Sequence, residues 1–497
     1  MKTGFESLEN SVFTQDRTVY GDVDGNTIFG TIKLKRFKTS VDIISDSYVG
    51  LKTSEEGWFD LLLERQTGGS VLLHNAFIIG GPEFYQKAEK CRQKVFPNSI
   101  VFHADKLTPK HEIKRIGFKL ERGEDFFAYT RLEMQYVGNL QGASKALLKK
   151  LRTQQNRKYR KENPKTSYDL TNPDTVYFQH KEADSIKFQA LDMSFEIFTD
   201  ARSEKGLGDN KTIKYDPKFY ITFNQPVSID HATDRVAIWH RYLNQIAYRR
   251  LSITEMSASG SDDPREGFAD IYMSNEPRVK KRKHDRFHVY HSPFNRYHDR
   301  EAFAEFLTRW FNLNVHRNRF RISLDHVINE KNNANDITKI GMLCSGIETL
   351  PLKGFRAPIT KAQSKALATT TLRKSKRLKL PFDKSRIFGL IATLRRPGLK
   401  AYLEHIFNKA SGIPKDDDRD AFIKQVIRLR NLAAHGSSSE DYNQPIAYPI
   451  QETLKALCVL YDLKTSNPEG EDFDVSKLIA KEFFDRAYMH FRAKLPR

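Results

Sequence analysis

The stretch RDAFIKQVIRLRNLAAH, residues 419–435, decides how the last part of the chain is expected to fold. On a helical wheel at about 100° per residue, its apolar side chains fall in one arc and most polar side chains fall beside it. The carboxylates at 416–418 can cap a helix N-terminus, and Gly436 readily adopts the left-handed conformation of a helix end. The pattern predicts an amphipathic helix over 419–435.

Arg430 lies inside the apolar arc and is expected to be the only charge there. Because a guanidinium keeps its proton at any ordinary pH, burying one without a partner is strongly unfavourable. Two explanations fit. Arg430 makes a structural ion pair inside a bundle, with Glu348 at the edge of a predicted helix over 336–350 as its partner, or this face is an interface whose cleft takes up a polyanion.

His435 falls on the last turn of the same helix, where the helix dipole favours a protonated imidazole. Such a histidine suits general acid or base catalysis. The spacing of Arg430 and His435 decides little alone, because it recurs at Arg235 and His240, Arg286 and His291, and Arg321 and His326. Arg430 and His435 differ from these pairs in three ways: Asn431 directly follows the arginine, small residues lie between the arginine and the histidine, and Gly436 follows the histidine where the helix is expected to end.

Strand signals nearly vanish after about residue 297, and helical spacing of apolar residues replaces them. Helices are predicted over 301–313, 336–350, 384–394, 398–410, 419–435 and 449–463. The last part of the chain, 297–497, is therefore expected to be an all-α bundle.

The front of the chain has strand and turn signals. Residues 27–35 alternate apolar and polar, and 115–120 form another strand candidate. Two apolar runs over 59–80 are broken by Gly68 and Gly69, which is typical of a hairpin. These patterns predict an antiparallel β domain over 1–143.

Between these parts lies a region with both kinds of signal. A basic stretch over 144–165 predicts a linker helix. Strand patterns over 174–224 are followed by a helix over 232–248 and by strands within 251–259 and 267–275. A mixed α+β middle module over 144–296 is expected, and the fold class is multidomain α+β.

The amino-acid composition limits the classes of partner that the protein is expected to bind. The net charge of +20 favours polyanions such as nucleic acid. No run reaches the roughly 18 apolar residues that a membrane-spanning helix needs, and the polar start resembles no leader, so we expect a cytoplasmic protein without a membrane partner. The cysteines form no CxxC pair, and neither metal nor cofactor is expected.

Basic residues outside the apolar arc are candidates for RNA contacts. The densest basic run is RVKKRKHDR, residues 278–286, a pattern that is most often an exposed loop. Lys424 and Arg428 lie on the His435 side of the predicted helix, where a solvated face explains them equally well. From the basic run, the candidates are Arg278, Lys280, Lys281, Arg282 and Lys283.

RNLAAH, residues 430–435, resembles the R-N-xxx-H motif of HEPN ribonucleases, and the region 297–497 resembles a HEPN domain. FGTIKLK (29–35), VLLHNAFIIG (71–80) and ITFNQPVSIDHATDRVAIWHRYL (221–243) are similar to the N-terminal regions of ApeA-like bacterial anti-phage proteins, which act by abortive infection. The resemblance spans most of the chain.

This resemblance implies a metal-independent endoribonuclease whose motif residues meet across the two-fold axis of a homodimer or a higher even oligomer. His435 would act as general acid or base, Arg430 would neutralise the phosphorane, and Asn431 would position the phosphate or the histidine. Attack by the ribose 2′-OH would leave a 2′,3′-cyclic phosphate. Transfer RNA is the first substrate to test. The N-terminal modules would sense a phage-derived trigger and restrain the nuclease.

Two other functions remain open. A non-catalytic RNA-binding regulatory protein would share the charge and the bundle, with Arg430 in a structural pair. A metal-dependent DNA nuclease would need a D…ExK pattern on strands, and no convincing example occurs in the sequence.

Overall fold

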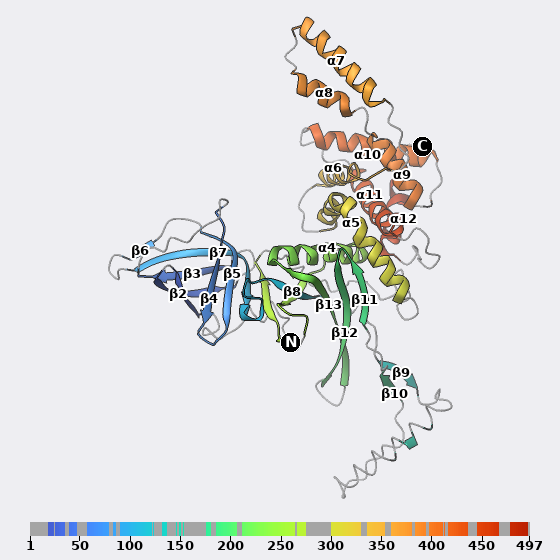
Figure 1. Cartoon of the computed structure of the whole chain (residues 1–497). Coiled ribbons are helices and arrows are strands. Elements are labelled where there is room, and N and C mark those ends of the chain that lie inside the picture. Colours follow the sequence, from blue (N-terminus) through green and yellow to red (C-terminus); the bar gives the residue numbers. More distant parts are fainter. Residues whose placement is uncertain are drawn as a thin grey trace.

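The computed structural model (Figure 1) joins an antiparallel β region to a helical region. It describes residues 18–23, 25–34, 39–46, 57–78, 83–85, 90–121, 123, 132–136, 146, 149–150, 153, 175–179, 185–205, 211–263, 266–274, 300–329, 335–352, 359–379, 383–393, 397–410, 412, 416–435, 445–466 and 478–495. In that part of the chain, no helix is both long and apolar enough to cross a membrane. The predicted helix over 144–165 lies mostly outside the described residues, and the basic run 278–286 lies wholly outside them.

Six strands near the N-terminus close into a barrel. They are β1 (Thr18–Val23), β2 (Asn26–Lys33), β3 (Ser40–Ser45), β4 (Phe59–Arg65), β5 (Ser70–Ile78) and β7 (Lys90–Phe102). The order is β7-β3-β2-β1-β4-β5, and β5 pairs again with β7. The short β6 (Glu83–Tyr85) also pairs with β7. Alternating burial along β2 and β4 follows the alternating sequence, because successive side chains of a strand point to opposite faces.

The hairpin predicted over 59–80 is confirmed. Leu63 on β4 pairs with Val71 on β5, and the turn between the strands holds Gly68 and Gly69 at φ of 93° and 83°. These left-handed conformations cost glycine little, which explains why the two glycines mark the turn in the sequence.

β7 extends beyond the barrel into an open antiparallel sheet, in the order β7-β15-β14-β8-β13-β12-β11. Its other strands are β8 (Ile113–Leu120), β11 (Ser185–Ala190), β12 (Met193–Lys205), β13 (Lys211–Val227), β14 (Ile253–Ser259) and β15 (Ala269–Met273). β9 (Leu132–Tyr136) and β10 (Thr175–Gln179) pair separately. β8 precedes residue 143 and pairs with β13 and β14, which follow it. The boundaries at 143 and 296 stay predictions.

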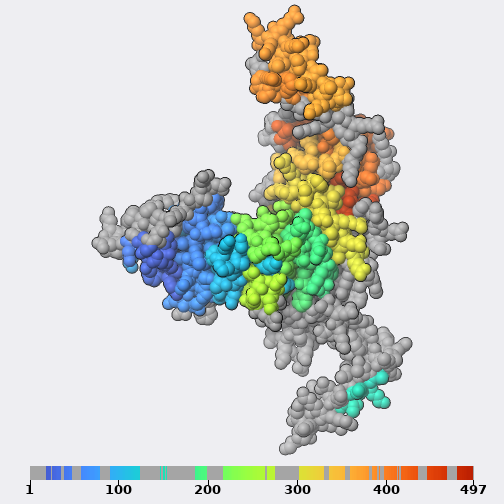
Figure 2. All heavy atoms as spheres, in the orientation of Figure 1, coloured from blue at the N-terminus to red at the C-terminus, as the bar shows by residue number. Residues whose placement is uncertain are grey.

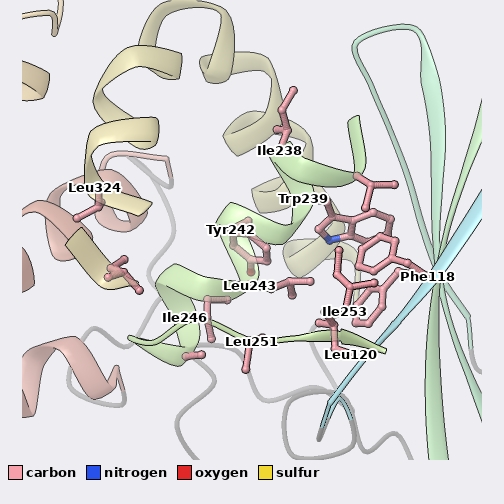
Figure 3. Packing of buried hydrophobic residues seen from close by; sticks show 14 of the residues in the cluster. Phe118, Leu120, Ile238, Trp239, Tyr242, Leu243, Ile246, Leu251, Ile253 and Leu324 are labelled. Atoms are coloured by element: carbon pink, nitrogen blue, oxygen red, sulfur yellow. The ribbon is translucent and has the colours of Figure 1, made fainter. Parts of the chain in front are cut away.

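Helix α4 (Ile229–Ala247) lies between this sheet and the helical region (Figure 3). Trp239 is fully buried, and its ring centroid lies 5.1 to 5.8 Å from the rings of Phe118, Phe188, Phe195 and Phe219 on the sheet. Tyr242, one turn later, contacts Trp310 of the next helix, with the ring centroids 5.2 Å apart and the rings tilted. Because α4 buries side chains toward both neighbours, the β and helical regions share one hydrophobic core.

The helical part is all-α, as the sequence predicts. Its helices are α5 (Arg300–Ile328), α6 (Asp336–Ile347), α7 (Lys361–Arg377), α8 (Lys384–Thr393), α9 (Leu399–Ala410), α10 (Asp417–His435), α11 (Ala447–Lys464) and α12 (Ile479–Ala493). α7 and α12 were not among the predicted helices, and α5 continues well past the predicted end at residue 313.

A buried ion cluster explains the extension of α5. Asp462 on α11 is fully buried, and its carboxylate accepts hydrogen bonds from Arg321 at 2.8 and 3.1 Å, from Arg317 at 3.0 Å and from the Trp310 indole at 3.0 Å. Arg321 also lies 3.6 Å from the Trp310 ring centroid. Burial alone would raise the pKa of Asp462, but Arg321 and Arg317 outweigh it, so this pKa is lowered.

A histidine joins the barrel to α4. His74 on β5 lies between two carboxylates: Nδ1 is 3.0 Å from Asp60 on β4, and Nε2 is 3.0 Å from Asp230 on α4. Asn75 donates to both carboxylates as well. Burial alone would lower the pKa of His74, but its interactions with Asp60 and Asp230 outweigh burial, so this pKa is raised from 6.5.

Replacing Asp462 with Asn should lower the free energy of unfolding by about 3–5 kcal/mol, because two arginines lose their buried counter-charge. Urea unfolding measures this. As a matched control, Asp485→Asn breaks the exposed pair with Lys481 and should cost less than about 1 kcal/mol. Equal, small losses in the two variants would show that the buried cluster does not stabilise the bundle.

The His74 contacts should make stability depend on pH. Because the folded pKa of His74 lies above its ordinary value, its contribution is complete below about pH 6.5 and is lost as pH rises through the folded pKa. Thermal melts at a series of pH values should therefore show a larger alkaline decrease in wild type than in His74→Gln. Two superimposable profiles would contradict this.

Candidate functional site

Helix α10 carries the candidate residues and is held by a deeply buried face. Phe422, Ile423, Val426 and Leu429 are at most 1% exposed. The Phe422 ring lies 5.5 Å from Phe407 of α9 and 5.2 Å from Phe491 of α12, both edge-on. This packing confirms the amphipathic helix that the sequence predicts, with an end at His435.

A glycine on α6 sets how closely α10 approaches. A Cβ on Gly341 would lie 2.9 Å from the Cβ of Ala433, closer than such atoms come in folded proteins. Ala433 lies between Asn431 and His435 in the motif. The backbone that carries the motif therefore packs directly on α6, and small residues on both helices allow it.

Arg430 lies at the edge of this packing, where the structure brings it together with Glu348. Its Nη2 is 3.3 and 3.4 Å from the two Glu348 oxygens, and its Nη1 donates to Asn431 Oδ1 at 3.4 Å. The side chains of Arg430 and Glu348 are each 33% exposed. The ion pair is long, and solvent reaches both partners. Arg430 is therefore neither sealed in the core nor free.

The expectation that Arg430 is the only charge on the inner side of the helix is wrong. Arg419, in the first turn of α10, is 2% exposed. Its guanidinium donates to Asn408 Oδ1 at 2.7 Å and to the Glu404 carbonyl at 3.0 Å, and it lies 5.1 Å from the Phe407 ring centroid. Neutral groups of α9 thus surround Arg419, which the helical wheel could have placed on this side.

Three other candidates on α10 are exposed. Lys424, Arg428 and Asn431 follow one another along the outer side of the helix, and the backbone of His435 continues that side at the final turn. The His435 side chain lies outside the described residues. So do Arg278, Lys280, Lys281, Arg282 and Lys283.

The arrangement presents a guanidinium that is one-third exposed, an exposed amide and a line of cations on one helix. A guanidinium can exchange a carboxylate for a phosphate, because both offer paired oxygens. In the described part of the chain, no group of three or more His, Cys, Asp and Glu is placed to hold a metal ion.

Arg321, which shares the motif spacing with His326, is a fully buried arginine, and the sequence pattern does not predict this burial. The signal that could have found this cluster is Asp462, an acid late in the apolar pattern of 449–463. An arginine within an apolar helical pattern therefore has two different environments in this chain. Arg321 on α5 belongs to a buried ion cluster, and Arg430 on α10 belongs to a more open ion pair.

Comparison with protein families gives two matches. A model described as ApeA N-terminal domain 1 matches residues 19–310, and one described as Apea-like HEPN matches residues 342–467, which include α7 to α11 and the second half of α6. Searches of the curated proteins and of the solved structures returned no match. Because the first model spans more than half of the 497 residues, the chain belongs to the ApeA family, with an Apea-like HEPN domain toward its C-terminus.

Proposed function

We propose that this protein is a metal-independent endoribonuclease of anti-phage defence that acts by abortive infection. Proteins with HEPN domains are typically ribonucleases, which supports the general assignment. The observation that carries it in this chain is the Arg430 side chain, which is one-third exposed and loosely held by Glu348. A guanidinium needed only for stability would be better placed where Arg321 lies, fully buried on a carboxylate.

The reaction needs a base, an acid and a cation near one phosphate. One imidazole removes the proton of the ribose 2′-OH, the O2′–P bond forms, and the P–O5′ bond breaks. A second imidazole gives a proton to the departing 5′ oxygen. The products are a 2′,3′-cyclic phosphate and a 5′-hydroxyl, and DNA is spared because it lacks the 2′-OH.

Two chains supply what one chain lacks. Each α10 contributes one His435 at its C-terminal end, so a pair of chains around a two-fold axis provides both imidazoles. Arg430 neutralises charge on the phosphorane, and Asn431, exposed beside it, positions the phosphate or the histidine. Lys424 and Arg428 extend the positive side along α10 toward neighbouring phosphates. A homodimer, or a higher even oligomer, is the active form.

The N-terminal region would sense the phage-derived trigger and restrain the nuclease. A series of side-chain contacts that leads from the sheet to α6 supports this role. The sheet contacts Trp239 on α4, Tyr242 on α4 contacts Trp310 on α5, and α5 packs against α6. α6 in turn carries Glu348. Transfer RNA is the first substrate to test, and the proposed location is the cytoplasm.

A non-catalytic RNA-binding protein remains the second candidate, because the contact of Arg430 with Glu348 is also what a structural ion pair looks like. The two candidates differ in what substitution of the motif removes.

His435→Ala should abolish new RNA ends in induced cells, and Arg430→Gln should reduce cleavage at least about 100-fold, because each removes an interaction of the transition state. Mapping of 5′-hydroxyl ends measures the effect of both substitutions. Matched cleavage assays of the purified chain with and without a chelator test metal independence. Arg486→Gln, at an exposed pair with Glu482 on α12, is the matched control and should cleave normally.

The non-catalytic alternative gives the opposite result: the same ends appear with wild type and His435→Ala, and Arg430→Gln changes only thermal stability. Activity lost on chelation would refute metal independence.

Glu348→Gln should lower the KM for RNA by up to about fivefold, because the glutamate competes with phosphate for Arg430 through a weak, solvent-exposed pair. Stability should change little for the same reason. Steady-state cleavage of a labelled transfer RNA checks this. A loss of activity as large as that of Arg430→Gln would mean instead that Glu348 is required to position the arginine.

A further inference from the structure

Helices α7 and α8 form a hairpin that stands apart from the bundle. They pack on each other around Ala368, Ile387 and Ile391, a small cluster separate from the main core. Figure 2 shows this hairpin, in orange, protruding beyond the rest of the helical region. The hairpin therefore has an apolar cluster of its own, and its outer surface is open to solvent.

The outer face of α7 is basic. Ser364, Ala368 and Ser375 are buried against α8, whereas Arg373, Lys374 and Arg377 are exposed within an arc of roughly 100° on the opposite side. The remaining exposed cations of the hairpin region are Lys361, Lys365, Lys376, Lys379, Lys384 and Arg386.

The cations of α7 have no acidic neighbour on their own helix, unlike those of α12. Exposed cations of α12 pair with acids one turn away, Lys481 with Asp485 and Arg486 with Glu482. α7 contains no acidic residue, so no such pair can form within it. The one acid of residues 359–393, Asp383, accepts from the Arg386 backbone N–H and the Ser385 hydroxyl at the start of α8. The basic face is thus uncompensated within its own hairpin.

Nucleic acid fits this face better than a membrane surface does. A helix that lies on a membrane needs an extended apolar face with bulky side chains beside its cations. Between the cations of α7 the exposed residues are mostly small, such as Ala366 and Thr370, and Leu367 is the one large exposed apolar side chain within the helix. Cations separated by small residues allow a phosphodiester backbone to approach closely.

The hairpin follows Glu348 of the candidate site along the chain. Glu348, which contacts Arg430, caps the C-terminus of α6, and α7, starting at Lys361, is the next helix along the chain. Resting on the proposed nuclease function, we propose that the α7–α8 hairpin is an arm that binds the phosphodiester backbone of the RNA substrate and delivers it to α10. The arm holds RNA by its phosphates and reads no sequence.

The test uses full-length His435→Ala protein, so that RNA is bound and not cut. The arm variant adds Arg373→Gln, Lys374→Gln and Arg377→Gln, and a charge-matched control adds Lys94→Gln, Lys106→Gln and Lys110→Gln at exposed positions of the β region. Fluorescence anisotropy measures the Kd for labelled poly(U) and poly(dT) over a range of salt concentrations. Sedimentation with phosphatidylserine vesicles measures membrane binding.

We expect the arm variant to bind poly(U) at least about tenfold more weakly than the control, with a shallower dependence of log Kd on log salt by about 2, because three phosphate contacts are lost. Poly(dT) should show the same loss, since the backbone is shared. Equal losses in the arm variant and the control, no binding of poly(U) by the parent, or arm-dependent binding to vesicles alone would each overturn the proposal. A failure of the nuclease function appears separately, as cleavage that survives His435→Ala.

Discussion

The helical region depends on one carboxylate. Asp462 lies in the last turn of α11, the helix that contacts α5, α6, α9, α10 and α12, and it holds two arginines and an indole from α5. In a medium of low dielectric constant, each of these cations would be strongly destabilised without it. The carboxylate therefore fixes the register of α5 on α11, and α6 and α10 are positioned by packing on those helices.

Two glycines of α6 allow close packing of this helix against both α5 and α10. A Cβ on Gly346 would lie 2.7 Å from the Cβ of Ser323 on α5, and one on Gly341 would meet Ala433 on α10. α6 is thus held closely on both sides, and its C-terminal Glu348 has a defined place relative to Arg430. The close packing of the α6 and α10 backbones fixes the positions of Glu348 and Arg430, although the ion pair between them is weak.

The sequence predicted the fold well where a local pattern decides structure. The hairpin at Gly68 and Gly69, the helix at 419–435 and the β-then-α order all follow from short periodicities. It failed where a distant partner decides: Arg317 and Arg321 interrupt the apolar pattern of α5, and their counter-charge, Asp462, lies far along the chain. α7 has small residues on its buried side, so it lacks the bulky apolar stripe that reveals a helix. For the site, the wheel suggested Glu348 as a neighbour of Arg430 but could not give the exposure of either side chain.

β7 belongs to two structures at once. One continuous strand pairs with β3 and β5 to close the barrel, and its end, Ser99 to Phe102, also pairs with β15 of the open sheet. Residues at this end are hydrogen-bonded on both sides, so neither structure can come apart without breaking bonds in the other. The barrel and the sheet should therefore unfold together as one cooperative unit. A force applied to the barrel is transmitted through β7 to the sheet that packs against α4, because the strand is continuous between them.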